Sequence, residues 1–125
     1  MTKKIILYSI TLILICSCYQ PQRDCESFKK GEFSFTSEID GKEITTTFMR
    51  NDTIEVGYFN GVSDTSSVRW INDCEYIVKK LHPKTKSEEQ SIHMKILTTT
   101  ENSYTFEYNL VGKSQTSRGT AIKLE

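Results

Sequence analysis

The chain has 125 residues, with 16 basic and 16 acidic side chains, so its formal charge at neutral pH is zero. It carries no basic stripe and no strongly basic domain, which excludes the electrostatic footprint of a nucleic-acid-binding protein. Its length allows one domain with a modest core. We interpret the scattered charges as a solvated surface.

The N-terminus has the layout of an export signal. Two lysines precede an apolar run over residues 5–15, which is too short for a bilayer core that needs about 20 apolar residues. The run ends in Ile15-Cys16-Ser17-Cys18, which resembles a bacterial lipobox, with an aliphatic residue, then a small residue, then the modified cysteine. Cys16 is the poorer candidate because a bulky residue precedes it. The sequence therefore predicts that residues 1–17 are removed and that Cys18 is lipidated.

This export signal also predicts a location. A lipidated chain is expected in the cell envelope, held to a membrane by acyl chains, on the outer membrane facing the periplasm or the cell surface. Removal of residues 1–17 lowers the basic residues from 16 to 14 against 16 acidic ones, so the net charge becomes −2. The mature chain is expected to consist of a lipidated tether over residues 18–30 and a single β domain over residues 31–125.

Besides Cys18, two cysteines remain in the mature chain, Cys25 and Cys74. Outside the cytoplasm an even pair is more often bridged than reduced, so we predict a disulfide, with two buried thiols as the alternative. The closed loop is worth about 4 kcal/mol in the chain-entropy model. His82 and His93 stand at no familiar ligand spacing from either cysteine, so we expect no metal site and no cofactor.

From Gly31 onward, apolar residues recur with a period of two between turn signals, which is typical of strands. Asp40-Gly41 and Asn60-Gly61 predict two-residue hairpins, and Pro83 predicts a loop. The expected inward residues, strand by strand, are Phe33 and Phe35; Ile44, Thr46 and Phe48; Ile54, Val56 and Tyr58; Val68 and Trp70; Cys74, Tyr76 and Val78; Ile92, Met94 and Ile96; Tyr104, Phe106, Tyr108 and Leu110; Thr120, Ile122 and Leu124.

About eight such strands with short connections predict an all-β fold. We expect an antiparallel meander that closes into a small lipocalin-like barrel or a strongly curved sheet, with a β-sandwich as the alternative. A barrel of this size is either filled by side chains or holds one small ligand. The many large inward candidates, Tyr58 and Trp70 among them, predict an interior that is mostly filled.

The sequence holds no phosphate loop, nucleophile elbow or zinc-protease motif, so we predict that the protein is not an enzyme, with a hydrolase that uses loop carboxylates as the alternative. The densest cluster of chemistry lies between residues 68 and 76 and holds the single tryptophan. The candidate ligand or partner surface in this cluster consists of Arg69, Trp70, Glu75 and Tyr76. We interpret the two aromatic residues as core rather than pocket wall, and the two charged residues as a pair across a turn on the surface.

Four segments, residues 24–35, 40–43, 66–76 and 104–108, look like a family of small lipoproteins from the Bacteroidota. Members of that family often carry the label DNA topoisomerase IV. A type II topoisomerase needs an ATP-binding fold, a metal-binding acidic cluster and a tyrosine nucleophile, which the predicted mature chain is too short to hold. The resemblance implies location and fold, and it implies no activity.

Two functions are consistent with these features. The first is a non-catalytic module that binds an envelope protein partner or stabilises an assembly, because a lipid anchor precedes a compact β domain. The second is a small-ligand carrier or sensor that uses a barrel mouth near Trp70 and Tyr76.

Overall fold

The computed structural model describes residues 23–124. The predicted signal peptide, Cys18 and the first part of the predicted tether lie outside the described residues. The elements are η2 (Glu26–Phe28), β1 (Gly31–Ile39), β2 (Lys42–Arg50), β3 (Ile54–Phe59), β4 (Val62–Trp70), β5 (Glu75–Lys80), η3 (Ser87–Glu89), β6 (Ile92–Thr99), β7 (Ser103–Leu110) and β8 (Ser117–Lys123).

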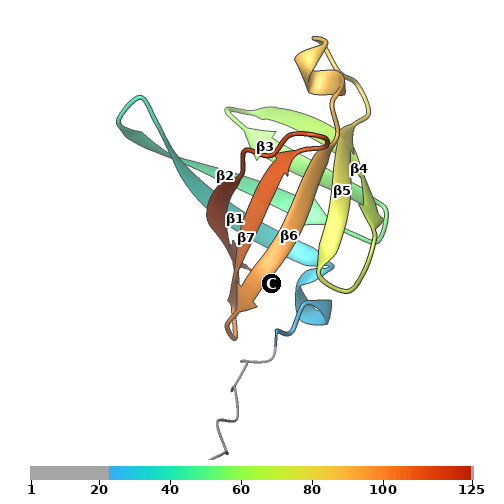
Figure 1. Cartoon of the computed structure of the whole chain (residues 1–125). Helices are drawn as coiled ribbons and strands as arrows, with labels where there is room; N and C mark the ends of the chain where they lie inside the picture. The colour runs from blue at the N-terminus through green and yellow to red at the C-terminus, as the bar shows by residue number, and fades with distance from the viewer. Residues whose placement is uncertain (1–22, 125) are drawn as a thin grey trace, which may run out of the picture.

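Each strand pairs with the next in antiparallel register, and β8 returns to pair with β1, which closes the barrel (Figure 1). The predicted meander barrel is confirmed, and the alternative sandwich is wrong. The two predicted hairpin turns are present, with positive φ at Asp40-Gly41 (53° and 76°) and at Asn60-Gly61 (48° and 75°). Positive φ at both central residues matches the twist of paired strands, which is why Asp-Gly and Asn-Gly stand there.

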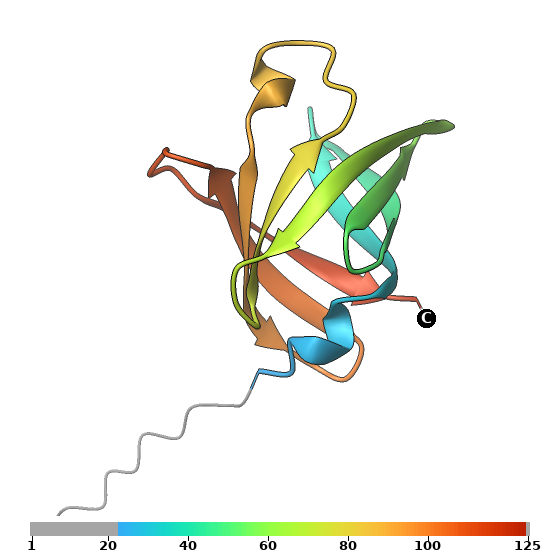
Figure 2. The ribbon, with the colours of Figure 1, turned by 90° about the vertical axis from the view of Figure 1, so that its right-hand side faces the viewer.

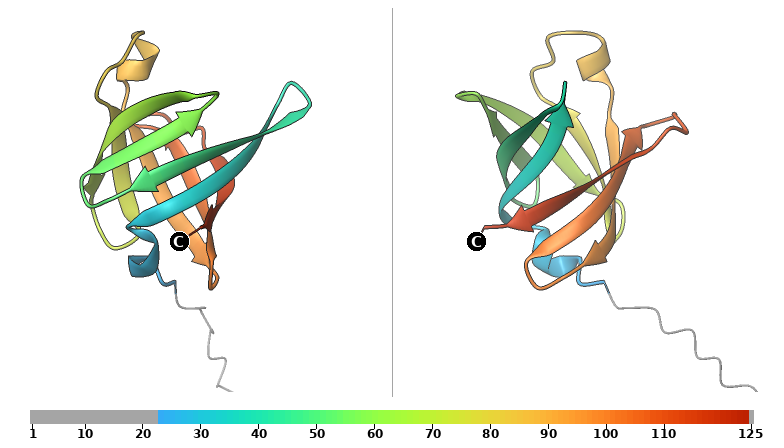
Figure 3. Two further views of the ribbon diagram at one scale, coloured as in Figure 1. Left: turned by 180° about the vertical axis from the view of Figure 1, so that it is seen from behind. Right: turned by 90° about the vertical axis from the view of Figure 1, so that its left-hand side faces the viewer.

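One 3₁₀ helix lies at each end of the barrel (Figures 2 and 3). We call the end that carries η2 the closed end, and the end that carries η3 the open end. The side chains of Cys25 and Phe28 are buried at the closed end, with 3% and 1% of their surfaces exposed. A disulfide joins Cys25 to Cys74, so the predicted bridge is confirmed. No helix in residues 23–124 is long and apolar enough to cross a membrane.

The folded domain begins before residue 31, so the predicted domain boundary is wrong. Residues up to 30 were expected to form a tether, yet Cys25 and Phe28 belong to the hydrophobic core together with Phe33 and Tyr104. Arg23 also donates a hydrogen bond to the backbone of β6. The sequence signal was misleading because charged residues surround the two apolar ones that pack. The folded domain therefore includes residues 23–30.

The predicted inward stripes are right on β1, β2, β4, β5, β6 and β7 and inverted on β3 and β8. Tyr58 and Ile122 are 44% and 46% exposed. On β3, Gly57 lies opposite the inward-facing Phe48 and therefore faces the interior. On β8, the inward position is occupied by Ala121, whose surface is fully buried. When a strand has apolar residues on both faces, its own sequence does not decide which face is buried. The pairing register with the neighbouring strands decides it, because a shift of one residue moves every side chain of the strand to the opposite face.

The inward face of β8 is built from small residues for a steric reason. A Cβ atom on Gly119 would lie 2.6 Å from the ring of Phe35 and 2.8 Å from the ring of Phe106. The two rings, with centroids 5.5 Å apart, occupy the space that a side chain would need. This side of the barrel is therefore fully packed.

Candidate functional site

The barrel interior is not filled throughout. A cavity of about 300 Å³ lies between the strands, and its wall is mostly aromatic and aliphatic. The lining residues are Phe35, Thr46, Phe48, Glu55, Gly57, Tyr76, Val78, Ile92, Met94, Tyr104, Phe106 and Tyr108. Thr46 and Gly57 also line a depression beside η3, so the cavity reaches the open end of the barrel. The prediction of a mostly filled interior is therefore wrong in this region.

Gly57 leaves the β3 side of the cavity open. It occupies an inward position on β3, and a Cβ atom built there would meet nothing within 4 Å. Gly119 faces the same interior from β8 and has no such room. The large side chain next to Gly57, Tyr58, points to the outside instead. Glycine in a strand interior weakens the strand, and it often marks a place that a ligand approaches closely.

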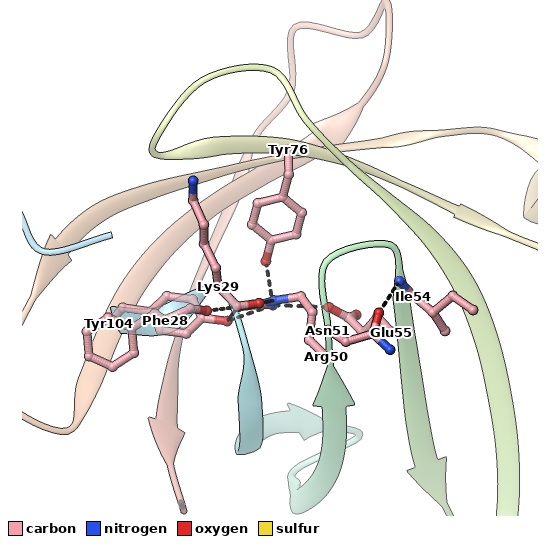
Figure 4. A network of polar contacts seen from close by, with 8 residues as sticks. All are labelled: Phe28, Lys29, Arg50, Asn51, Ile54, Glu55, Tyr76 and Tyr104. Carbon is pink, nitrogen blue, oxygen red and sulfur yellow. Dashed lines mark hydrogen bonds and ion pairs between the residues drawn. The ribbon is translucent and has the colours of Figure 1, made fainter. Parts of the chain in front are cut away.

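Behind the cavity wall, near the closed end, lies a buried arginine that bonds to three lining residues, and Figure 4 shows it with its partners. Arg50, the last residue of β2, is 3% exposed. Its Nη1 donates to the hydroxyls of Tyr76 (3.0 Å) and Tyr104 (3.3 Å). Its Nε donates to the carbonyl of Lys29 (3.1 Å), and its Nη2 to the carbonyl of Phe28. One guanidinium therefore joins β2, β5, β7 and η2.

Aromatic rings enclose the same guanidinium. The carbon at its centre lies 4.8 Å from the ring centroid of Phe33 and 4.9 Å from that of Tyr76. Cation–π contacts of this kind are worth more when the cation is removed from water. The geometry explains how a full positive charge is kept inside an apolar core.

Burial alone would lower the pKa of Arg50, but the nearby Tyr76, Tyr104 and Glu55 outweigh it, so the pKa lies above its ordinary value. Burial raises the pKa of the phenols of Tyr76 and Tyr104. At neutral pH the arginine is therefore charged and both phenols are protonated. The site near the closed end is a fixed positive charge inside a shell of oxygen acceptors.

Glu55 is the one charged residue among those that line the cavity. It lies opposite Arg50 in the β2–β3 register, and its Oε2 accepts from Nη1 of Arg50 at 3.1 Å. Within the described part of the chain, no donor reaches its other oxygen, Oε1. The side chain is 22% exposed. One carboxylate oxygen is therefore available to a molecule in the cavity.

At the open end, Lys80 forms ion pairs with Asp64 (2.8 Å) and Glu88 (2.7 Å). Two hydrogen bonds raise the pKa of Lys80, and the bond to Asp64 has a larger effect than the bond to Glu88. Glu88 also accepts hydrogen bonds from the backbone of Lys84 and Thr85, which fastens the β5–β6 connection. The rim of the cavity is therefore polar, and the charges of Lys80, Asp64 and Glu88 are paired there.

The four residues of the predicted ligand or partner surface do not form one surface. Trp70 and Tyr76 face the interior, whereas Arg69 and Glu75 face outward. Tyr76 is 1% exposed and helps to line the cavity, as well as touching Arg50. Trp70 packs on Tyr76 with ring centroids 4.4 Å apart and precedes the turn that carries Cys74. It therefore lies at the closed end, and the predicted barrel mouth beside Trp70 is wrong. Its Nε1 is the buried side-chain nitrogen or oxygen that lacks a hydrogen-bond partner among the described residues.

Arg69 and Glu75 lie on the outer face, but they do not pair with each other. Glu75 accepts from the side chain of Asn72 and lies 3.1 Å from Nε2 of His93. The hydrogen bond from Asn72 lowers the pKa of Glu75. In the register, Arg69 lies opposite Ile77, so the expected Arg69–Glu75 pair is wrong. His93 lies on the same outer face, on β6.

Three residues of the site were not predicted: Glu55 and Gly57, which line the cavity, and Arg50, which lies behind its wall. The reading of all charges as a solvated surface is wrong for the first two. A signal for Arg50 exists, since it continues the inward stripe of Thr46 and Phe48 by one step of two residues. The signal for Gly57 is a glycine in the middle of a strand pattern. Nothing in the sequence around Glu55 distinguishes it from an outward charge.

Within residues 23–124, no group of three or more histidine, cysteine, aspartate or glutamate side chains is placed to hold a metal ion. No protein-family model matches the chain, and no curated protein matches it in sequence. The resemblance to Bacteroidota lipoproteins therefore stays a prediction.

Proposed function

We propose that the protein is a lipid-anchored envelope protein whose barrel binds one small molecule, as a carrier or a sensor. The observation that carries the proposal is the cavity of about 300 Å³ with its largely apolar, aromatic wall. Ligand pockets are typically about 300–1,000 Å³ and combine such walls with few polar groups. The lining includes no histidine, cysteine, serine or lysine, which supports binding rather than catalysis.

The position of the anchor supports the same function. If Cys18 carries the lipid, the chain between it and the buried Cys25 spans at most about 25 Å, even fully extended. Cys25 belongs to the closed end, so the open end faces away from the bilayer. A ligand would then enter from the aqueous side. This geometry favours ligand binding over the protein-interaction module as the main role, because the cavity gives the ligand a defined place.

Filling the cavity from Gly57 tests the binding site. Gly57→Leu puts a side chain into open space, so the barrel should keep its stability while it loses its ligand. The test uses residues 18–125 with Cys18→Ser, since residues 23–124 contain the whole barrel, its core and its disulfide. Titration with N-phenyl-1-naphthylamine, which fluoresces in apolar surroundings, should show binding weakened by about tenfold or more, as steric exclusion predicts.

The matched control is Val56→Leu, which enlarges the neighbouring residue on the outer face of β3. It should bind the dye like the unchanged protein. Dye affinity that is equal in Gly57→Leu and Val56→Leu would show that the dye binds elsewhere and would remove the support for the cavity.

The anchor has its own test in the full chain. Cys18→Ala should abolish labelling by radioactive palmitate and move the protein from the membrane fraction to the soluble one, because the acyl chains supply the membrane affinity. Cys16→Ala is the control and should retain both label and location. Label that persists in Cys18→Ala would assign the lipid to another residue or refute the lipoprotein signal.

A further inference from the structure

We infer that the ligand is a neutral molecule with an apolar or aromatic body and one hydrogen-bond donor that reaches Oε1 of Glu55. This inference rests on the proposed function and goes beyond it by naming the chemistry of the ligand. It follows from three features of the cavity: its one open carboxylate oxygen, its balance of charge and the placement of its other polar groups.

The open acceptor is Oε1 of Glu55. Oε2 of the same carboxylate is engaged by Nη1 of Arg50 at 3.1 Å, which fixes the orientation of the group. Within residues 23–124, no side chain or backbone group donates to Oε1. The side chain is 22% exposed, so water reaches this oxygen in the empty barrel. A ligand that fills the cavity excludes that water and must supply one hydrogen-bond donor in its place, because a buried carboxylate oxygen left unpaired is costly.

The opposite charges of Arg50 and Glu55 compensate each other, which disfavours a charged ligand. The positive charge of Arg50 and the negative charge of Glu55 lie 3.1 Å apart and compensate each other, so the inner end of the cavity is neutral as a unit. A cationic ligand would add an uncompensated buried charge, and an anionic ligand would face the carboxylate directly. Burial of an unpaired charge costs several kcal/mol per ion.

The other polar groups give the ligand its direction. The hydroxyls of Tyr76 and Tyr104 already accept from Arg50. The remaining polar lining groups besides Glu55 are the hydroxyls of Thr46 and Tyr108. Each of these residues also lines a depression outside the cavity, beside η3 for Thr46 and beside the β7–β8 connection for Tyr108, and so lies nearer the rim. The wall around Glu55 is otherwise formed by rings and aliphatic side chains. The donor of the ligand therefore points inward to Glu55 and its apolar body fills the cavity.

Three probes with the same ring system separate these possibilities. 2-Naphthol carries a hydroxyl donor, 2-methoxynaphthalene lacks the donor, and 2-naphthoate carries a negative charge. Calorimetric titration of residues 18–125 with Cys18→Ser should give 2-naphthol about tenfold tighter binding than 2-methoxynaphthalene, the effect of one hydrogen bond to a charged acceptor. 2-Naphthoate should bind weakest.

Glu55→Gln assigns the preference to this residue. The amide oxygen can still accept from Arg50, so the group that faces the ligand becomes a donor. The preference for 2-naphthol over 2-methoxynaphthalene should fall to less than about threefold, and 2-naphthoate should gain affinity because the charge of Arg50 is no longer compensated. The control is Glu107→Gln, an arginine-paired and 26% exposed glutamate on the outer face, which should keep the original order.

The outcomes distinguish the two proposals. Equal affinity for 2-naphthol and 2-methoxynaphthalene in the unchanged protein would overturn the inferred ligand chemistry and leave the cavity as a binding site. Absence of binding by all three probes, or binding that Gly57→Leu does not reduce, would count against the proposed function itself. The comparison within the unchanged protein decides the inference even if Glu55→Gln does not fold.

Discussion

Arg50→Met is expected to lower the free energy of unfolding by about 3–5 kcal/mol, the usual cost of removing one partner from a buried ion pair. Methionine keeps the length of the side chain and donates no hydrogen bond. The substitution therefore leaves the carboxylate of Glu55, the hydroxyls of Tyr76 and Tyr104 and the carbonyl of Phe28 without their donor. Since the whole stability of a domain this size is about 5–15 kcal/mol, much of it would be lost.

Urea unfolding followed by far-UV circular dichroism measures this loss. The control is Arg118→Met, which removes an arginine that is 73% exposed and paired with Glu107 on the outer face. An exposed pair is worth about 0–1 kcal/mol, so this variant should unfold almost like the unchanged protein. Equal, small losses in both variants would contradict a structural role for the buried guanidinium.

Removal of the disulfide should cost about 4 kcal/mol. The bond joins residues separated by 49 positions, and a loop of that length restricts the unfolded chain strongly. In the folded state it also holds η2 against the closed end, where Phe28 is buried and accepts from Arg50. Loss of the bond should therefore loosen the same network from its other side.

The double variant Cys25→Ala/Cys74→Ala measures this effect by urea unfolding, with a reductant as an independent test. Reductant should lower the unfolding midpoint of the unchanged protein toward that of the double variant and leave the double variant unaffected. A midpoint in the unchanged protein that reductant does not move would show that the bridge contributes nothing to stability.

The fold was predictable because several local signals agree. Asp40-Gly41 and Asn60-Gly61 specify hairpins of one type, and the stripe of Tyr104, Phe106 and Tyr108 specifies one buried face. Short connections then leave a meander as the simplest topology. The disulfide was predictable for a different reason, since it depends on the number of cysteines and the predicted compartment.

The cavity was not predictable, because it depends on the phase of one strand. In β3, apolar side chains stand on both faces, so Ile54, Val56 and Tyr58 looked like the buried set. Pairing with β2 places Glu55 and Gly57 inside instead. The pairing register between two strands is set by the folded sheet, so the six residues of β3 alone do not predict it. The tether boundary was missed because the packing of Phe28 depends equally on tertiary contacts.

Methyl NMR tests the central claim, that the barrel cavity binds a small molecule. Residues 18–125 contain two methionines, Met94 in the cavity wall and Met49 on the outer face, 52% exposed. With ¹³C-methyl methionine in the Cys18→Ser chain, added 2-naphthol should shift the Met94 resonance in a saturable way, because the aromatic ring lies beside it, and leave Met49 in place. A Met94 resonance that does not move, or a shift confined to Met49, would contradict binding in the cavity.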